Sequence, residues 1–215
     1  MKVAVTGIIH SKSTKFFNEY IKSIYNQSFK EFDLLLFNQN INDERGLHLD
    51  SNLSLSEAKK FTIEYIKDKG YDILIFTDTD DFFENTYVEE LVNALKEYDI
   101  AFTDVCIYDS INETRIYNYF QKCGVPDIVN EEYLKDKNCI GWGNSGIKLK
   151  LHHDMGEFEK RWNVCDWHYF KTIIEKNSTI AKFIKKSLVN YRQHDNNISR
   201  PNTREFKLWN GVNNE

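Results

Sequence analysis

Three carboxylates follow a short apolar run: Asp78, Asp80 and Asp81 come directly after residues 73–76 (ILIF). Four consecutive apolar residues indicate a buried strand of a parallel sheet, and ligands of open α/β sheets bind where such strands end. Three crowded acids repel one another unless a cation lies among them. Their hard oxygens suit Mg²⁺ or Mn²⁺, with a substrate diphosphate completing the shell. An acidic turn in which Asp80 or Asp81 caps the next helix explains the same residues equally well.

The first 98 residues contain the elements that must position this acidic turn. Apolar runs at residues 2–9, 32–37 and 73–76 predict three buried strands, each followed by a helix-period pattern. The predicted helices cover residues 16–25, 56–69 and 85–98. Strands that alternate with helices form parallel sheets with right-handed crossovers. We therefore expect an α/β, Rossmann-like layer of the nucleotide-binding type.

The pattern changes after residue 99. Shorter strands are predicted at residues 100–102, 105–108, 180–184 and 188–191, with a hairpin partner at 114–120 and an edge strand at 143–151. A helix is predicted at 166–176. We expect one domain, with a nucleotide-binding half at 1–98, an acceptor-side half at 99–200 and a C-terminal tail at 201–215.

Composition excludes several classes of protein. The chain has 215 residues, 41% of them hydrophobic, and a net charge of −5 without a basic stripe, which argues against a nucleic-acid partner. No apolar run approaches the roughly 20 residues of a transmembrane helix, although peripheral attachment to a membrane or to a partner protein stays open. The four cysteines show no zinc or Cys-x-x-Cys spacing, and no signal peptide is visible, so a cytoplasmic protein with reduced thiols is expected.

Five blocks, in order, resemble motifs of the family 2 glycosyltransferases, which are inverting enzymes of the GT-A fold. They are residues 23–28 (SIYNQS), 76–82 (FTDTDDF), 155–159 (MGEFE), 165–167 (CDW) and 191–199 (YRQHDNNIS). The resemblance extends over residues 1 to about 200. It implies a GT-A-type domain with a central, mostly parallel mixed sheet flanked by helices.

The resemblance also implies an activity, namely metal-dependent transfer of a sugar from a nucleotide diphosphate sugar, with UDP the expected nucleotide. The acceptor would be a hydroxyl of a saccharide or a lipid-linked saccharide, as in bacterial surface polysaccharide synthesis. Asp80 and His194 become the expected metal ligands, and Asp166 the general base. The nucleotide would contact Thr6, Asn38, Lys59, Asp78 and Thr79, and the acceptor would contact Trp142 and Trp167.

Three positions depart from the family pattern. Residues 38–40 (NQN) stand where the family carries an Asp that pairs with the uracil edge, so the identity of the base is open. Lys59 replaces an Arg that approaches the nucleotide, which keeps the charge but loses the planar fork. Cys165 replaces the Glu that usually precedes the base.

Structural explanations compete with these assignments. Asp166 can cap the predicted helix, the loop around Trp142 can be a plain turn, Arg192 fits a surface position in a strand, and residues 152–154 (HHD) fit a surface better than a metal cluster. Two other functions also remain. Asp78 and Asp80 resemble the nucleophile motif of haloacid-dehalogenase-type phosphatases, and the departures at 38–40 and 59 fit a sugar-nucleotide-binding module without turnover.

Overall fold

The computed structural model describes residues 1–39, 44–50, 52–152, 165–194 and 197. It contains the three predicted β-α units of the first half of the chain. Their strands and helices are β1 (Val3–His10), α1 (Phe17–Tyr25), β2 (Asp33–Gln39), α2 (Leu55–Asp68), β4 (Ile73–Phe76) and α3 (Tyr87–Glu97). Both β2 and β4 pair with β1 in parallel, so the carboxyl ends of all three strands lie at one edge of the sheet.

The second half extends the same sheet. Its longer elements are β6 (Ile100–Asp109), β9 (Ser145–Lys148), α6 (Cys165–Asn177) and β10 (Ala181–Gln193). The shorter ones are η1 (Thr14–Phe16), β3 (Leu47–His48), β5 (Phe82–Phe83), β7 (Thr114–Ile116), α4 (Tyr119–Lys122), β8 (Ile128–Val129), α5 (Glu131–Leu134) and η2 (Leu149–Leu151). Along the sheet the strand order is β3-β2-β1-β4-β9-β6-β10-β5. A mixed, mostly parallel sheet flanked by helices is therefore confirmed.

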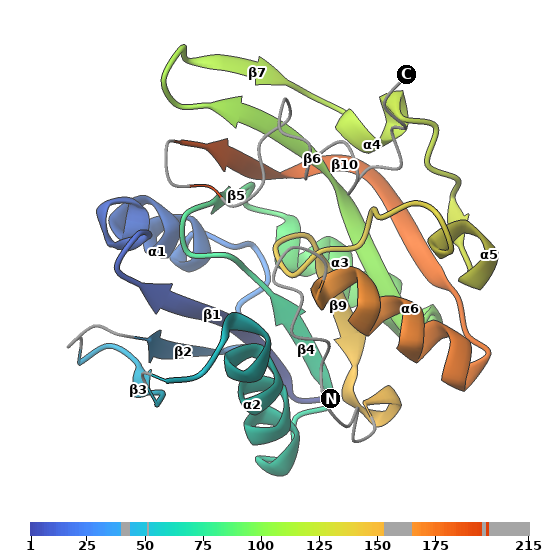
Figure 1. Cartoon of the computed structure of the whole chain (residues 1–215), viewed down its shortest axis with the longest axis horizontal. Helices are drawn as coiled ribbons and strands as arrows, with labels where there is room; N and C mark the ends of the chain where they lie inside the picture. The colour runs from blue at the N-terminus through green and yellow to red at the C-terminus, as the bar shows by residue number, and fades with distance from the viewer. Residues whose placement is uncertain (40–43, 51, 153–164, 195–196, 198–215) are drawn as a thin grey trace.

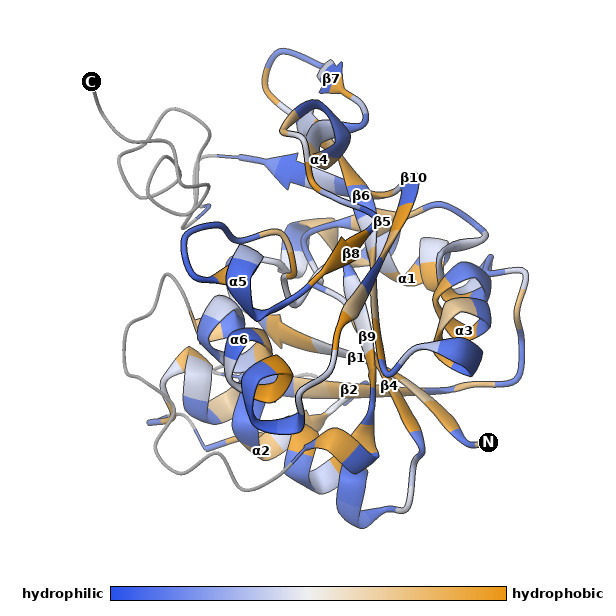
Figure 2. Cartoon of the chain, turned by 90° about the vertical axis from the view of Figure 1, so that its right-hand side faces the viewer, coloured by the Kyte–Doolittle hydropathy of each residue, from blue (hydrophilic) through white to orange (hydrophobic). Residues whose placement is uncertain are grey.

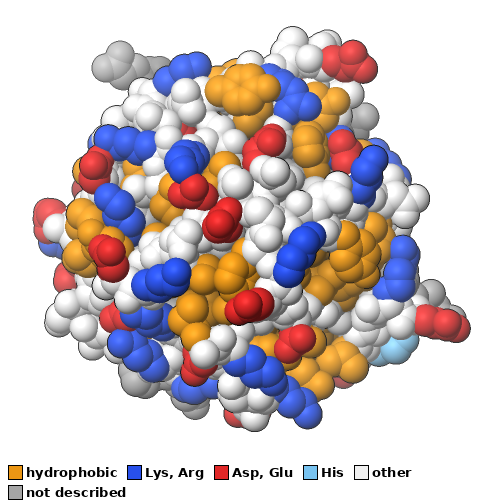
Figure 3. Space-filling view, turned by 180° about the vertical axis from the view of Figure 1, so that it is seen from behind, with side chains coloured by type: hydrophobic (Ala, Val, Ile, Leu, Met, Phe, Trp, Pro, Cys, Tyr) orange, Lys and Arg blue, Asp and Glu red, His pale blue; other side chains and the backbone are white. Residues whose placement is uncertain are grey.

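Figures 1 and 2 show the layers: α2 and α6 lie on one face of the sheet, and α1 and α3 on the other. The central strands are hydrophobic along their length in Figure 2, as expected when both faces of a parallel sheet are covered. Over the surface in Figure 3, lysine and arginine side chains alternate with aspartate and glutamate, and no basic stripe crosses that face. No helix of the described ranges has both the length and the apolar character needed to cross a bilayer.

Four predictions about the second half were wrong. The two short strands predicted at 100–102 and 105–108 form one continuous strand, β6. β9 is a central strand, antiparallel to both β4 and β6, and not an edge strand. The two short strands predicted at 180–191 form one strand, β10, whose pairing with β6 shifts register around Ser187. Only Thr114–Ile116 of the predicted hairpin partner is extended, because the carboxylate of Asp104 accepts hydrogen bonds from the backbone N–H groups of Phe120 and Gln121 and fixes a helical turn there.

Helix α2 begins with a complete capping box. The Ser54 side chain accepts a hydrogen bond from the Glu57 N–H, and the Glu57 side chain accepts one from the Ser54 N–H. This cap matters for function because α2 carries Lys59 one turn later. We expect Ser54→Ala to lower the free energy of unfolding by about 1 kcal/mol. Urea denaturation measures the change, with the exposed Ser11→Ala as a control; equal stability of the two variants would contradict the prediction.

Candidate active site

The acidic turn after β4 is fastened to the neighbouring strand β1. Thr77 donates from its backbone N–H (2.9 Å) and from its hydroxyl (2.6 Å) to the carbonyl of Thr6. The Thr79 hydroxyl donates to the carbonyl of Ile8 at 2.8 Å. These bonds come from residues that are almost completely buried, so the chain has little freedom to move between β4 and Asp81.

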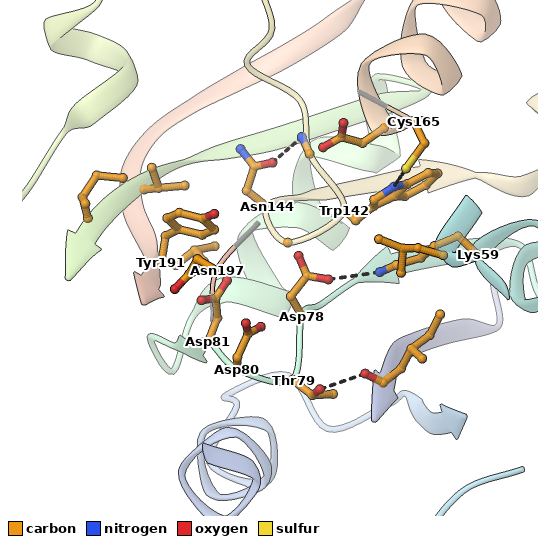
Figure 4. A pocket seen from close by; sticks show the side chains of 18 of the residues that line it. Lys59, Asp78, Thr79, Asp80, Asp81, Trp142, Asn144, Cys165, Tyr191 and Asn197 are labelled. Atoms are coloured by element: carbon orange, nitrogen blue, oxygen red, sulfur yellow. Dashed lines mark hydrogen bonds and ion pairs between the residues drawn. The ribbon is translucent and has the colours of Figure 1, made fainter. Parts of the chain in front are cut away.

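Asp78 meets Lys59 at the centre of the pocket. The Lys59 ammonium comes from α2 and lies 3.0 Å from Asp78 Oδ1, and its side chain is only 7% exposed. The other oxygen, Asp78 Oδ2, faces the loop that precedes β9, where a Cβ built on Gly143 would lie 3.0 Å from it. Figure 4 shows this loop passing directly over Asp78. The lack of a side chain at Gly143 therefore leaves room for the carboxylate.

Asp80 and His194, the two residues expected to be metal ligands, lie together. His194 Nε2 is 3.2 Å from Asp80 Oδ2, and both side chains are mostly buried. Burial alone would raise the pKa of Asp80, but the hydrogen bond with His194 and the nearby imidazoles outweigh it and hold the pKa below its ordinary value. Asp80 is thus an ionised carboxylate beside an imidazole.

Asp81 differs from its neighbours. Its Oδ1 accepts a hydrogen bond from the Arg192 N–H at 2.8 Å, while Oδ2 is buried without a hydrogen-bond partner among the described residues. Burial raises the pKa of Asp81 well above its ordinary value, and the charges of Asp80 and Asp78 add to the rise. The turn therefore concentrates more negative charge than the surrounding side chains neutralise.

Arg192 is buried, contrary to the surface position expected from the sequence. It is 5% exposed, and its guanidinium is enclosed by the rings of Phe16, Phe82 and Tyr108. Its Nε donates to the carbonyl of Asp80 at 2.8 Å, and its terminal nitrogen pairs with Glu19. Arg192 therefore holds the acidic turn from the side opposite β1.

Arg192→Met should lower the free energy of unfolding by about 2–3 kcal/mol, because the Asp80 carbonyl loses a charged donor in a buried place. Glu19→Gln leaves that bond intact and removes only a half-exposed ion pair, so its cost should stay below about 1 kcal/mol. Thermal or urea unfolding of both variants measures the difference. Equal losses would show that the bond to the acidic turn contributes nothing.

Asp166 lies at the start of α6, where the sequence placed the general base. Its Oδ1 accepts a hydrogen bond from the Trp167 N–H at 2.7 Å, and Oδ2 lies near Gly141, 3.2 Å from where a Cβ would stand. Burial raises the pKa of Asp166 to about 7, and the negative charge of Asp78 also raises it. The hydrogen bond from Trp167 and the positive charge of Lys59 lower it, but by less. This carboxylate can therefore accept a proton near neutral pH.

One pocket brings most of these side chains together (Figure 4). Of the residues predicted from the sequence, it is lined by Lys59, Asp78, Thr79, Asp80, Trp142 and Asp166. Trp142 is mostly buried: its ring lies 4.8 Å from that of Phe76, and its Nε1 donates to Cys165 Sγ at 3.4 Å. His194 reaches the site through Asp80.

Four predicted residues do not line this pocket: His194, which contacts Asp80 from outside the lining, and Thr6, Asn38 and Trp167. Thr6 lies in the middle of β1, which continues to His10, and its hydroxyl donates to the Leu35 carbonyl. Asn38 is buried in β2 and donates to the Gly46 carbonyl. Trp167 directs its indole N–H to the Leu134 carbonyl.

Other predictions fall wholly or partly outside the described residues: the block at 155–159, the end of the block at 191–199 and the tail at 201–215. Of residues 152–154, only His152 is described, and it is buried beside Tyr169, not at the surface.

The sequence analysis missed several pocket residues. Among them are His10, the last residue of β1, and Lys12, two positions further on; Gly141, Gly143 and Asn144 belong to the loop around Trp142, which the sequence already offered for the acceptor site or as a plain turn. Asn144 braces that loop, since its side chain accepts from the Gly141 N–H and donates to the carbonyls of Thr103 and Cys139. The two glycines separated by Trp142 were a usable signal, because each lies where a carboxylate approaches the backbone.

The donor set suits a divalent cation that shares its shell with a substrate. Ionised Asp80, the imidazole of His194 and the unsatisfied Oδ2 of Asp81 offer hard oxygens and one nitrogen beside an excess of negative charge. Within the described ranges, no three His, Cys, Asp or Glu side chains are grouped so as to hold a metal ion by themselves. Mg²⁺ in particular often takes one or two carboxylates from the protein and further oxygens from a phosphate.

Comparison with known proteins gives structural relatives only: no family model and no curated protein sequence matches the chain. Residues 1–349 of TarS from S. aureus, solved in complex with UDP-GlcNAc, superpose with a TM-score of 0.66 at 12% identity. The mannosyltransferase PcManGT from Pyrobaculum calidifontis, solved with GDP-Man and Mn²⁺, gives 0.64 at 12% identity. The chain has a GT-A-type fold.

The superpositions include nearly all of the chain, 92% with TarS and 89% with PcManGT. They include only 60% of the TarS fragment and 56% of PcManGT. The GT-A-type fold predicted from the sequence is therefore confirmed, and the chain spans little more than half the length of these relatives. At this level of identity the likeness establishes the fold alone, and the chemistry has to be argued from the pocket.

Proposed function

We propose that the chain is an inverting glycosyltransferase that moves a sugar from a nucleotide diphosphate sugar to a hydroxyl acceptor with the help of Mn²⁺ or Mg²⁺. The observation that carries the proposal is the shared pocket of Asp78, Asp80 and Asp166. Asp80, a carboxylate able to hold a diphosphate-bound cation, and Asp78, one able to contact the nucleotide, lie there beside a carboxylate able to accept a proton. TarS with UDP-GlcNAc and PcManGT with GDP-Man support a nucleotide-sugar donor.

The polar side of the pocket suits the leaving diphosphate. Asp80 and His194 would hold the cation, which when bound supplies a Lewis acid that stabilises the departing phosphate charge. Lys59 would add a positive charge from α2. In the bound state Asp78 would leave its ion pair with Lys59 and bind a ribose hydroxyl, so that the Lys59 ammonium could pair with the phosphates. Asp78 and Thr79 are thus proposed as nucleotide contacts. Arg192 and the bonds to β1 keep the turn in place for this work.

Asp166 would serve as the general base. A single displacement needs a base within reach of the attacking hydroxyl, on the face of the sugar opposite the leaving group. The backbone N–H of Trp167 fixes one oxygen of Asp166, and the other faces the pocket at Gly141. Trp142, beside it, is proposed to contact the acceptor.

The elevated pKa of Asp166 predicts a pH profile. Because the base acts when deprotonated, kcat/KM should fall about tenfold per unit as pH drops below about 7. The same carboxyl binds its proton more tightly in the folded than in the unfolded state. Its contribution to stability is therefore full at acidic pH and is lost as pH rises through about 7. A kcat/KM that stays flat between about pH 5 and 8 would contradict this assignment.

The proposal is tested by measuring nucleotide release. The chain is incubated with UDP- and GDP-sugars, Mn²⁺ or Mg²⁺, and a panel of saccharide and alkyl glycoside acceptors, and free UDP or GDP is assayed. Release that requires an acceptor and a cation supports the transferase. Tight donor binding without release under any of these conditions would instead support a sugar-nucleotide-binding module, and release of inorganic phosphate from a phosphomonoester would support a phosphatase.

A further inference from the structure

The pocket has a second wall that the nucleotide chemistry does not use. This apolar wall comes from β6, α4 and β10 and consists of Val105, Ile107, Tyr119, Phe120, Val189 and Tyr191. Four of these side chains are buried, including Val105 at 7% exposure and Ile107 at 5%, so they form the floor of the pocket and not its outer rim. The wall carries no charged group, and the two tyrosines supply its only polar atoms.

The apolar wall and the charged groups lie on different sides of the acidic turn. In the sheet, β1 is on one side of β4, whereas β6 and β10 follow β9 on the other. Lys59, His10 and Lys12 belong to the β1 and α2 side. Figure 4 shows Lys59 and Tyr191 on opposite sides of Asp78. A diphosphate requires the charged side, which leaves the wall to another part of the substrates.

The sugar and the diphosphate of the donor give the wall little to bind. The sugar and diphosphate of a nucleotide sugar are rich in hydroxyl and phosphate oxygens, whose burial against uncharged aliphatic side chains is unfavourable without hydrogen-bond partners. Ligand pockets place their apolar surface against apolar parts of the ligand, with a few polar groups fixing its orientation. Since Asp166 lines the same pocket, the molecule that presents the attacked hydroxyl is the one that can reach the wall.

We infer that the acceptor is amphiphilic, with an alkyl or aryl group near the attacked hydroxyl that packs on the apolar wall of Val105, Ile107, Phe120 and Val189. This inference rests on the proposed glycosyltransferase function and narrows its acceptor class. An acceptor made only of sugar units would leave the wall in contact with hydroxyl groups. An alkyl glycoside would cover it, and each methylene removed from water should contribute about 0.8 kcal/mol, or roughly fourfold in kcat/KM.

The experiment compares matched methyl, butyl and hexyl glycosides of glucose, galactose and N-acetylglucosamine as acceptors, with the donor held fixed. For whichever sugar is accepted, kcat/KM should rise at least tenfold from methyl to hexyl, with KM for the donor unchanged. Equal use of the three chain lengths, or transfer only to saccharides without an apolar group, would overturn the inference while leaving the transferase intact. If no donor releases its nucleotide with any acceptor, the proposed function itself fails.

A variant locates the effect in the apolar wall. Val105→Thr keeps the side-chain shape but replaces a methyl by a hydroxyl, and should lower the ratio of kcat/KM for the hexyl glycoside to kcat/KM for the methyl glycoside about three- to tenfold. Val125→Thr is the matched control, because Val125 is similarly buried, at 5% exposure, but does not line the pocket. An unchanged preference in Val105→Thr, or the same loss in Val125→Thr, would overturn the assignment of the wall.

Discussion

Replacing Asp166 by asparagine is expected to lower kcat about 10²- to 10⁴-fold, the range typical of a lost general base, while the Kd for UDP or GDP stays unchanged. The amide keeps the size of the side chain and can still accept the hydrogen bond from the Trp167 N–H. It cannot take a proton from the acceptor hydroxyl. The loss should therefore appear in the chemical step, and the acid limb of the pH profile near pH 7 should vanish with it.

The control for this variant is Asp68→Asn, on the exposed last turn of α2. It makes the same chemical change away from the pocket and should leave kcat unaltered. Asp166→Asn with undiminished kcat would exclude Asp166 as the base. A parallel loss of nucleotide affinity would instead assign Asp166 a role in holding the donor.

Replacing Asp80 by asparagine should reduce the Mn²⁺-dependent gain in nucleotide diphosphate affinity by about 10²-fold. The carboxylate is the proposed cation ligand, and its amide is neutral but similar in shape. Removing a negative charge can by itself favour an anionic ligand, so affinity without metal is expected to stay equal or to improve. The ratio of Kd without and with Mn²⁺, from isothermal titration calorimetry, is therefore the informative quantity.

His194→Asn tests the second proposed ligand in the same titration. It should lower the Mn²⁺-dependent ratio in the same direction as Asp80→Asn, and the double variant should lose little more than the stronger single variant, because both remove one shared interaction. A full metal effect in Asp80→Asn would show that the cation is held elsewhere in the pocket.

The first half of the fold was predictable because each of its strands and helices is marked by a pattern within its own residues. Residues 3–10, 33–39 and 73–76 are apolar runs between helices with clear periodicity, and a buried parallel strand requires such a run. In the second half the sequence signals mislead. Lys185 and Lys186 are exposed within β10 and split one strand into two apparent ones. The insertion of β9 between β4 and β6 depends on strand order, which no local pattern records.

The site residues that could be predicted are reactive side chains that stand at the end of a predicted strand or the start of a predicted helix. The acidic turn follows β4 and Asp166 lies in the first turn of α6. Both positions face the same edge of the sheet, so these residues share one pocket. The burial of Arg192 could not be foreseen, since its enclosing rings, Phe16, Phe82 and Tyr108, come from three separate segments. Thr6 lies four residues before the end of β1, and it is His10, the last residue of that strand, that lines the pocket.

The most direct test of the central claim is thermal unfolding of the chain with UDP, GDP, CDP or TDP, each with and without Mn²⁺. A ligand that binds only the folded state raises the melting temperature by mass action. At about 100 times the Kd, the stabilisation is roughly 2.7 kcal/mol, or a shift of about 5–10 °C for a chain of this size. We predict such a shift with at least one nucleotide diphosphate, and only when Mn²⁺ is present. No shift with any of them would contradict the assignment of this pocket to a nucleotide sugar.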